Sequence, residues 1–270
     1  MDNVEKRIND LSVKELNHFT WLCGVRILPF LGGHNEFSYW GDKVQTHLNS
    51  VFFALDKLAS FSKEHSFESI NNKDAIAKPV FDATRNVYVK PPNSVIKAIY
   101  HLVIDDVVSA ISFVNSALSH HSDKSVEDKF QKIMLSDIEA LLNNDKKTLC
   151  NDTTIYGELW ESFINDLKKV GCDYWAELYA NLFENRFEID DELDTRIVVS
   201  DEHKAEGAAD LGEYLKERQG MDTQSIDEVR IIIIGQAAAG KTSLARRLLD
   251  ADEKMPDANS CTLGIRLGYT

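Results

Sequence analysis

The chain has 270 residues, of which 43% are hydrophobic and 27% are charged, and these proportions are typical of a globular protein large enough for more than one core. It carries 30 basic and 44 acidic residues. Residues 229–270 hold six basic and four acidic residues, so the net charge of −14 leaves −16 on residues 1–228. Nucleic acid and anionic membranes bind basic surfaces, so this balance argues against both as non-specific partners of the N-terminal region.

Cysteine usage and hydropathy indicate the compartment. The four cysteines are Cys23, Cys150, Cys172 and Cys261, and none forms a C-x-x-C pair. We interpret them as reduced intracellular thiols rather than as disulfides or metal ligands. No stretch reaches the roughly 18 apolar residues of a membrane-spanning helix, and the first residues lack the apolar core of a signal peptide. The sequence therefore predicts a cytoplasmic protein with no membrane insertion.

Helical patterns begin close to the N-terminus. Ser12 and Glu15 form an S-x-x-E capping box, which predicts a helix running toward Leu28 and ending at Pro29. A second helix is expected over 42–61, because apolar residues recur there at helical spacing. These residues are Val44, Leu48, Val51, Phe52, Leu55 and Leu58.

A third helix is expected over 94–118, after a mixed and polar stretch at 63–93. It is apolar almost all round, which is typical of a helix in the middle of a bundle. Further helices are expected over 126–143, 156–170, 174–183, 190–198 and 201–218. The sequence therefore predicts an all-α domain over 1–219, followed by a polar, glycine-containing linker over 220–228.

Two polar pairs in the helical region invite a catalytic or metal-binding interpretation. Asp105 and Asp106 interrupt the apolar run. Neighbouring residues of a helix point about 100° apart, so we favour a structural role over shared acid–base chemistry. His120 and His121 lie at the expected end of that helix, where histidine suits the helix dipole, and their spacing does not suit a metal.

A phosphate-binding motif follows the linker. The run is Ile231-Ile232-Ile233-Ile234-Gly235-Gln236-Ala237-Ala238-Ala239-Gly240-Lys241-Thr242, an apolar strand followed by G-x-x-x-x-G-K-T. This pattern is the phosphate-binding loop (P-loop) of nucleoside triphosphatases. Gly235 lets the chain turn out of the strand, and Gly240 lets the backbone approach a phosphate closely. The apolar residues after the loop predict the helix that completes the motif.

The chemistry of the loop assigns roles to its residues. Backbone N–H groups and the positive end of the helix dipole face the anion. Lys241 reaches the β- and γ-phosphates, and the Thr242 hydroxyl ligates Mg²⁺. The residues expected to bind the nucleotide are Gly235, Gln236, Ala237, Ala238, Ala239, Gly240, Lys241, Thr242 and Ser243.

The stretch Thr262-Leu263-Gly264-Ile265 makes the comparison more specific. With it, residues from about 227 to 270 resemble the start of a Ras-like small GTPase domain of the Roc type. In that family a T-x-G-I/V stretch is the first switch, whose threonine binds Mg²⁺ and senses the γ-phosphate. Thr262 matches it, 21 positions after Lys241. The resemblance implies GTP and Mg²⁺ as cofactors, Lys241 and Thr262 as catalytic residues, and Thr242 and Thr262 as Mg²⁺ ligands.

The chain departs from that family at two motifs. The family's D-x-x-G second switch and N-K-x-D guanine motif have no match after Thr262. We therefore expect 229–270 to be the incomplete start of a P-loop GTPase domain, holding the first strand, the loop and the helix of an α/β fold. On this expectation the intact protein is longer and the present chain is inactive alone.

A second resemblance covers the helical region. Tyr174-Trp175-Ala176-Glu177-Leu178-Tyr179, continued through Glu192-Leu193 to Glu213-Tyr214, is similar to a helical module of large bacterial multidomain proteins. That module stands in front of a catalytic or signalling domain. The resemblance implies a bacterial origin and an accessory role, with no chemistry to carry over.

Taken together, the sequence predicts a mainly α chain with a helical bundle in front of a truncated P-loop domain. The expected function is a GTP-binding switch, with a protein partner for the helical domain. One alternative is a signalling ATPase of the NACHT type behind a helical sensor. Another is a helical interaction module in which nucleotide binding does not function.

Overall fold

The structure is a computed structural model that describes residues 2–32, 36–63, 73–85, 87–120, 125–144, 153–184, 189 and 192–220. The chain divides into two compact units, residues 1–220 and 221–270, and every described residue belongs to the first. That part of the chain contains helices and turns and no strand, which confirms the mainly α prediction. The strand and the P-loop predicted over 229–242 lie outside the described residues.

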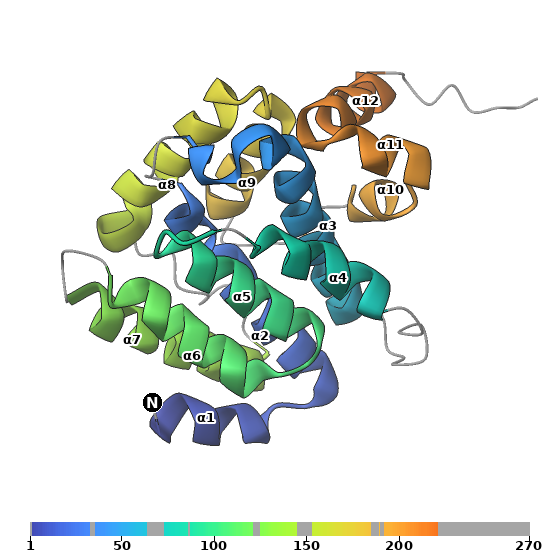
Figure 1. The fold of residues 1–270 in the computed structure, drawn as a ribbon. Coiled ribbons are helices and arrows are strands. Elements are labelled where there is room, and N and C mark those ends of the chain that lie inside the picture. The colour runs from blue at the N-terminus through green and yellow to red at the C-terminus, as the bar shows by residue number, and fades with distance from the viewer. Residues whose placement is uncertain are drawn as a thin grey trace, which may run out of the picture. The chain divides into compact units, whose positions relative to one another are not determined.

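The helices follow one another with short connections (Figure 1). They are α1 (Asp2–Arg7), α2 (Val13–Arg26), α3 (Val44–Lys63), α4 (Lys73–Ala83), α5 (Pro92–Val103), α6 (Val107–Leu118), α7 (Ser125–Leu142), α8 (Thr153–Lys169), α9 (Asp173–Glu184), α10 (Leu193–Ile197), α11 (Asp201–Glu206) and α12 (Ala208–Gly220). Three 3₁₀ turns, Ile8–Asp10, Leu28–Leu31 and Ser38–Lys43, join the first of them.

The capping box predicted at Ser12 is present. The Glu15 amide donates to the Ser12 hydroxyl at 3.4 Å, and the Ser12 amide donates to the Glu15 carboxylate at 2.7 Å. These hydrogen bonds from Ser12 hold the pKa of Glu15 below its usual value. The helix that they start is α2, which ends at Arg26, before the 3₁₀ turn that contains Pro29.

The single helix predicted over 94–118 is wrong, because the chain breaks at Asp105. There φ is +62°, in the left-handed region that aspartate tolerates better than most residues. Asp106 then caps α6, its carboxylate accepting from the Ser109 amide at 3.1 Å. α5 and α6 consequently pack against each other along their length, as a helical hairpin. The apolar run is long because it serves both helices.

Two further expectations needed correction. The polar stretch at 63–93 contains α4, whose buried face consists only of Ala77, Val80 and Ala83. The helix predicted over 201–218 is instead α11 and α12, separated by Gly207, whose φ of +113° no helix can include. In α4 and at the junction of α11 and α12, the structure depends on contacts with other helices that the local pattern of apolar residues does not show.

The core of the helical unit forms where α2, α3 and α5 meet. α5 lies between α4 and α6 and also packs on α2 and α3 (Figure 1). A close approach at Gly24 of α2 joins the three: a Cβ there would lie 2.6 Å from Leu55 Cδ2 and 3.4 Å from Leu102 Cδ1. A β-carbon at this position would require the Leu55 side chain to move, so glycine allows the close packing seen between α2 and α3.

A buried ion pair connects α2 to α7. The guanidinium of Arg26 donates to both carboxylate oxygens of Asp137, at 2.7 and 2.8 Å, and the two side chains are 3% and 1% exposed. A bidentate geometry offsets part of the cost of removing both charges from water. The residues are 111 positions apart in the chain, so the pair fixes a long-range contact of the fold.

No helix within the described ranges is long and apolar enough to cross a membrane. This agrees with the absence of a spanning segment expected from the sequence.

The substitution Asp137→Ala is predicted to lower the free energy of unfolding by about 3–5 kcal/mol, because it leaves the Arg26 guanidinium buried without its carboxylate. The measurement is denaturant unfolding of the whole chain followed by far-ultraviolet circular dichroism. Asp128→Ala is the matched control, since Asp128 is exposed on the same helix, and it should change stability by no more than about 0.5 kcal/mol. Equal losses in the two variants would contradict the role of the pair.

Candidate functional site

The residues predicted to bind nucleotide, Gly235 to Ser243 and Thr262, lie outside the described residues. The structure therefore neither brings them together nor separates them. What it describes is the chain that leads to them, α10 to α12, and how these last helices are held on the rest of the helical unit. We refer to this set of contacts as the terminal-helix anchor. Its central residues are Gln45, Asp56, Trp175, Arg196 and Ala209.

Gln45, near the start of α3, holds the first turn of α12. Its carboxamide nitrogen donates to the Val170 carbonyl at 2.6 Å. Its carboxamide oxygen accepts from the Ala209 amide at 2.8 Å and from the Cys172 thiol at 3.5 Å. One side chain thus joins α3, the turn after α8 and the start of α12. A Cβ at Gly207 would lie only 3.0 Å from the Gln45 Cβ, so the chain passes closely over this residue.

Trp175 of α9 makes a second contact with α12. Its indole N–H donates to the Ala208 carbonyl at 2.8 Å, and the ring is buried against Phe52 of α3 at 4.8 Å between centroids. α12 approaches α9 closely at Gly212, where a Cβ would lie 2.9 Å from the Tyr174 Cβ. Aromatic burial of this kind supplies much of the apolar contact at such an interface.

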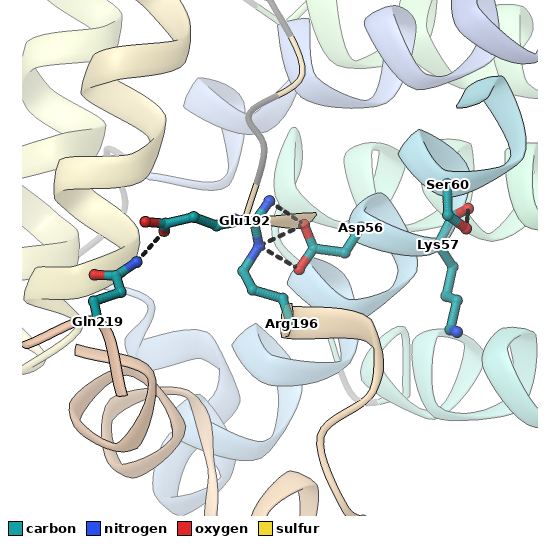
Figure 2. A network of polar contacts seen from close by, with 6 residues as sticks. All are labelled: Asp56, Lys57, Ser60, Glu192, Arg196 and Gln219. Carbon is teal, nitrogen blue, oxygen red and sulfur yellow. Dashed lines mark hydrogen bonds and ion pairs between the residues drawn. The ribbon is translucent and has the colours of Figure 1, made fainter. Parts of the chain in front are cut away.

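A buried ion pair between Asp56 of α3 and Arg196 of α10 completes the anchor (Figure 2). Arg196 Nε lies 3.1 and 3.0 Å from the two carboxylate oxygens, and Arg196 Nη2 lies 3.0 Å from Oδ1. The side chains are 9% and 4% exposed. Since removing one member would leave a charge in a low-dielectric environment, the pair holds α10 against α3 strongly.

Two further polar contacts lie near this pair (Figure 2). The Gln219 side chain donates to the Glu192 carboxylate, which joins the last turn of α12 to the residue before α10. On α3, the Ser60 hydroxyl donates to the Lys57 carbonyl at 2.8 Å. The contact of Gln219 holds α12 one residue before Gly220, where α12 and the first unit end.

A small cavity lies beside the ion pair. Its lining includes Asp56 and Arg196 together with Trp21, Tyr179 and Ile189. It has room for little more than a water molecule, which can hydrogen-bond to the polar atoms of its wall. The cavity is too small for a nucleotide or another substrate, so we assign the region a positional role.

Titratable groups around the anchor are poor nucleophiles. Burial, offset in part by Arg196, raises the pKa of the Tyr174 phenol to about 12. Burial likewise raises the pKa of the Cys172 thiol to about 12, and it raises the pKa of Cys23 strongly. At neutral pH both thiols are protonated, and the thiolate is the reactive form.

The aspartate pair noted in the sequence has a structural role, whereas His121 of the histidine pair lies outside the described residues. Asp105 forms an ion pair with Lys73, and Asp106 is the cap of α6. Hydrogen bonds from Ser109, with a smaller contribution from His101, hold the pKa of Asp106 below its usual value. No group of three or more potential metal ligands occurs among the residues that the structure describes.

Comparisons with known proteins do not assign the chain to a family. A scan of protein-family models, a search of the curated proteins and a search of solved structures each found no match.

Local sequence patterns did not single out Gln45, Asp56, Arg196 and Ala209, although Asp56 left a signal. Asp56 follows Leu55 and comes four positions after Phe52, on the apolar face of the predicted helix. A charge on such a face needs a partner. The partner could not be named, because Arg196 lies 140 positions away. Gln45 left no comparable signal, since its importance comes from the backbone groups that converge on it.

The substitution Asp56→Ala is predicted to lower the free energy of unfolding by about 3–5 kcal/mol, because Arg196 loses its carboxylate in a buried position. It should also free α10 to α12 first, so hydrogen-exchange mass spectrometry should show lost amide protection over 193–220. Asp42→Ala is the control at an exposed position shortly before α3, and its exchange should match that of the wild type.

A double variant separates the charge from the contact. Asp56→Leu with Arg196→Met removes both charges and keeps apolar volume, and buried ion pairs often tolerate such replacement. Protection over 193–220 should then return toward the wild-type value. Unchanged protection in Asp56→Ala would show that this ion pair does not hold the terminal helices.

Proposed function

We propose that the protein is a nucleotide-dependent switch that binds GTP with Mg²⁺ and hydrolyses it, with the helical unit as its accessory domain. The observation that carries the proposal is the order of residues 229–242, in which an apolar run, predicted to be a strand, leads directly into G-x-x-x-x-G-K-T. The T-x-G-I stretch that begins at Thr262 favours GTP over ATP, through its resemblance to the first switch of Ras-like domains.

The side chains proposed for the site suit its ligand. Threonine hydroxyls at 242 and 262 are hard oxygen donors, which Mg²⁺ prefers. Bound Mg²⁺ would neutralise charge on the phosphates. Lys241 would hold the β- and γ-phosphates while the loop amides stabilise the charge that develops as a water molecule attacks the γ-phosphate in line. After release of phosphate, Thr262 would lose its contact and the first switch would relax.

The anchor supports an accessory role for the helical unit. α12 ends at Gly220, and the second unit begins at the next residue. Gln45, Asp56 and Trp175 fix α10 to α12 on α3 and α9. A force transmitted along the chain at residue 221 would therefore act on helices that are fixed to the rest of the unit. A nucleotide-dependent switch needs such a rigid connection if the state of the nucleotide is to alter another domain.

Lys241→Ala is predicted to weaken GTP binding by on the order of a hundredfold, because the phosphates lose a cationic partner. Isothermal titration with GTP and Mg²⁺ measures the loss. Lys254→Ala is the matched control, since Lys254 lies in the same segment and outside the motif. The helical circular dichroism should stay unchanged in both variants. Equal GTP affinity in Lys241→Ala and the wild type would remove Lys241 from this role.

Thr262→Ala is predicted to weaken binding of a non-hydrolysable GTP analogue about tenfold and to leave GDP binding unchanged, because the hydroxyl senses only the γ-phosphate state. Competition titrations of the intact protein with GTP, GDP and ATP give both comparisons. Preferential binding of ATP would place the protein among signalling ATPases. Equal effects on GTP analogue and GDP would contradict the assignment of Thr262 as a switch residue.

A further inference from the structure

Away from the anchor, a continuous row of aromatic rings crosses α4, α5 and α6. Phe81 of α4 contacts Tyr100 of α5 at 5.4 Å between ring centroids. Tyr100 contacts His101 at 5.2 Å, and His101 stacks on Phe113 of α6 at 5.1 Å. The three helices lie next to one another with α5 in the middle, so the row runs across their axes (Figure 1).

A cation lies over the ring at each end of the row. The Arg85 guanidinium carbon is 5.9 Å from the Phe81 centroid, and the Lys97 Nζ is 5.5 Å from the Phe113 centroid. Such contacts hold the cations in place without neutralising them. We define the basic aromatic strip by the rings and cations joined in this way. Its members are Phe81, Arg85, Lys97, Tyr100, His101 and Phe113.

The cations of the strip keep most of their capacity to bind carboxylates. Lys97 forms no ion pair with any residue in the described part of the chain. Arg85 lies 3.1 Å from Asp82, and these side chains are 67% and 37% exposed. An exposed pair of this kind contributes little and exchanges readily with another partner.

Part of the strip is exposed to solvent. Lys97, Tyr100 and His101 recur at helical spacing on α5, and all three are half-buried, with the Tyr100 ring packed against the core. Phe81 is 46% exposed. The connection between α4 and α5 contains a further aromatic residue, Tyr88, which is 88% exposed and follows the buried Val87. Aromatic rings and arginine are the residue types that most often dominate binding energy at protein interfaces.

The local charge opposes that of the whole domain. Residues 73–106, from the start of α4 to the cap of α6, contain five basic and four acidic residues, a balance of +1, whereas residues 1–228 carry −16. The carboxylates nearest the end of α5 are already engaged, Asp105 with Lys73 and Asp106 with the Ser109 amide and His101. A basic, aromatic surface on an acidic domain therefore selects a partner by charge.

We propose that the basic aromatic strip is a docking surface for an acidic segment of a partner protein that also carries leucine or phenylalanine side chains. Carboxylates of that segment pair with Arg85 and Lys97, and its apolar side chains pack on Phe81, Tyr100 and Phe113. A nucleic acid could also stack on the rings, but the strip offers only the two cations Arg85 and Lys97 to a backbone that carries a charge at every nucleotide. The proposal does not depend on nucleotide binding.

The test is fluorescence anisotropy of the whole chain with a fluorescein-labelled synthetic amphipathic peptide composed of Glu, Asp, Leu and Phe. The wild type should bind this peptide, more weakly as salt is raised, and should not bind a matched peptide with glutamine and asparagine in place of the acidic residues. Arg85→Glu and Lys97→Glu should each weaken binding about tenfold or more. Lys168→Glu, an exposed lysine on α8, is the control and should bind as the wild type does.

Other results would overturn the proposal. One such result is that the acidic peptide does not bind the wild type. Another is that Arg85→Glu binds the peptide with the same affinity as the wild type, since Arg85 is exposed enough for the substitution to leave folding unaffected. Binding of a labelled single-stranded oligonucleotide that both charge reversals abolish would identify a nucleic-acid surface instead. Self-association in analytical ultracentrifugation that Arg85→Glu abolishes would identify a second copy as the occupant. Lys241→Ala should bind the peptide normally, so failure of this proposal and failure of the nucleotide proposal are distinguishable.

Discussion

The arrangement of the helical unit depends on one constraint, namely that Asp56 presents a carboxylate on the apolar face of α3. A charge there is stable only with a partner, and the chain supplies Arg196 from α10. Placing Arg196 brings α10 onto α3, and the short connections then leave α11 and α12 little freedom except to follow. Gln45 and Trp175 form hydrogen bonds with the backbone at the start of α12. These contacts are consistent with the position of α10 that the ion pair fixes.

α3 is consequently the element that the other parts share. Along its length it packs on α2, α4, α5, α10 and α12. The same helix that holds the terminal helices also supports α4 and α5, which carry most of the basic aromatic strip. Interiors packed to crystal-like density transmit small displacements instead of absorbing them. A partner bound to the proposed strip would therefore contact helices that pack on α3, the helix on which α10 and α12 also pack.

The sequence predicted those features whose cause is local. The capping box at Ser12 and the apolar periodicity of α3 and α9 depend on neighbours within a turn or two, so pattern alone identifies them. The break at Asp105 was missed, although Asp105 and Asp106 interrupt the apolar run, because apolar residues continue at helical spacing on both sides of them. α4 was missed because Pro79 is unfavourable inside a helix and its small alanines give only a weak apolar stripe, which packing against α3 and α5 overrides.

Long-range pairs limit such prediction in a different way. Arg26 and Asp56 each stand among apolar residues, so the sequence shows that each needs a counter-charge, yet their partners lie 111 and 140 positions away. Both pairs join an early helix to a later one. An apolar contact of equal area would tolerate a shift of one helix along the other by one turn. A bidentate guanidinium–carboxylate pair does not tolerate that shift, because displacing either residue leaves a buried charge. The value of these pairs therefore lies in fixing one register between distant helices. That register places the start of α12 opposite Gln45, and the P-loop motif follows α12 along the chain.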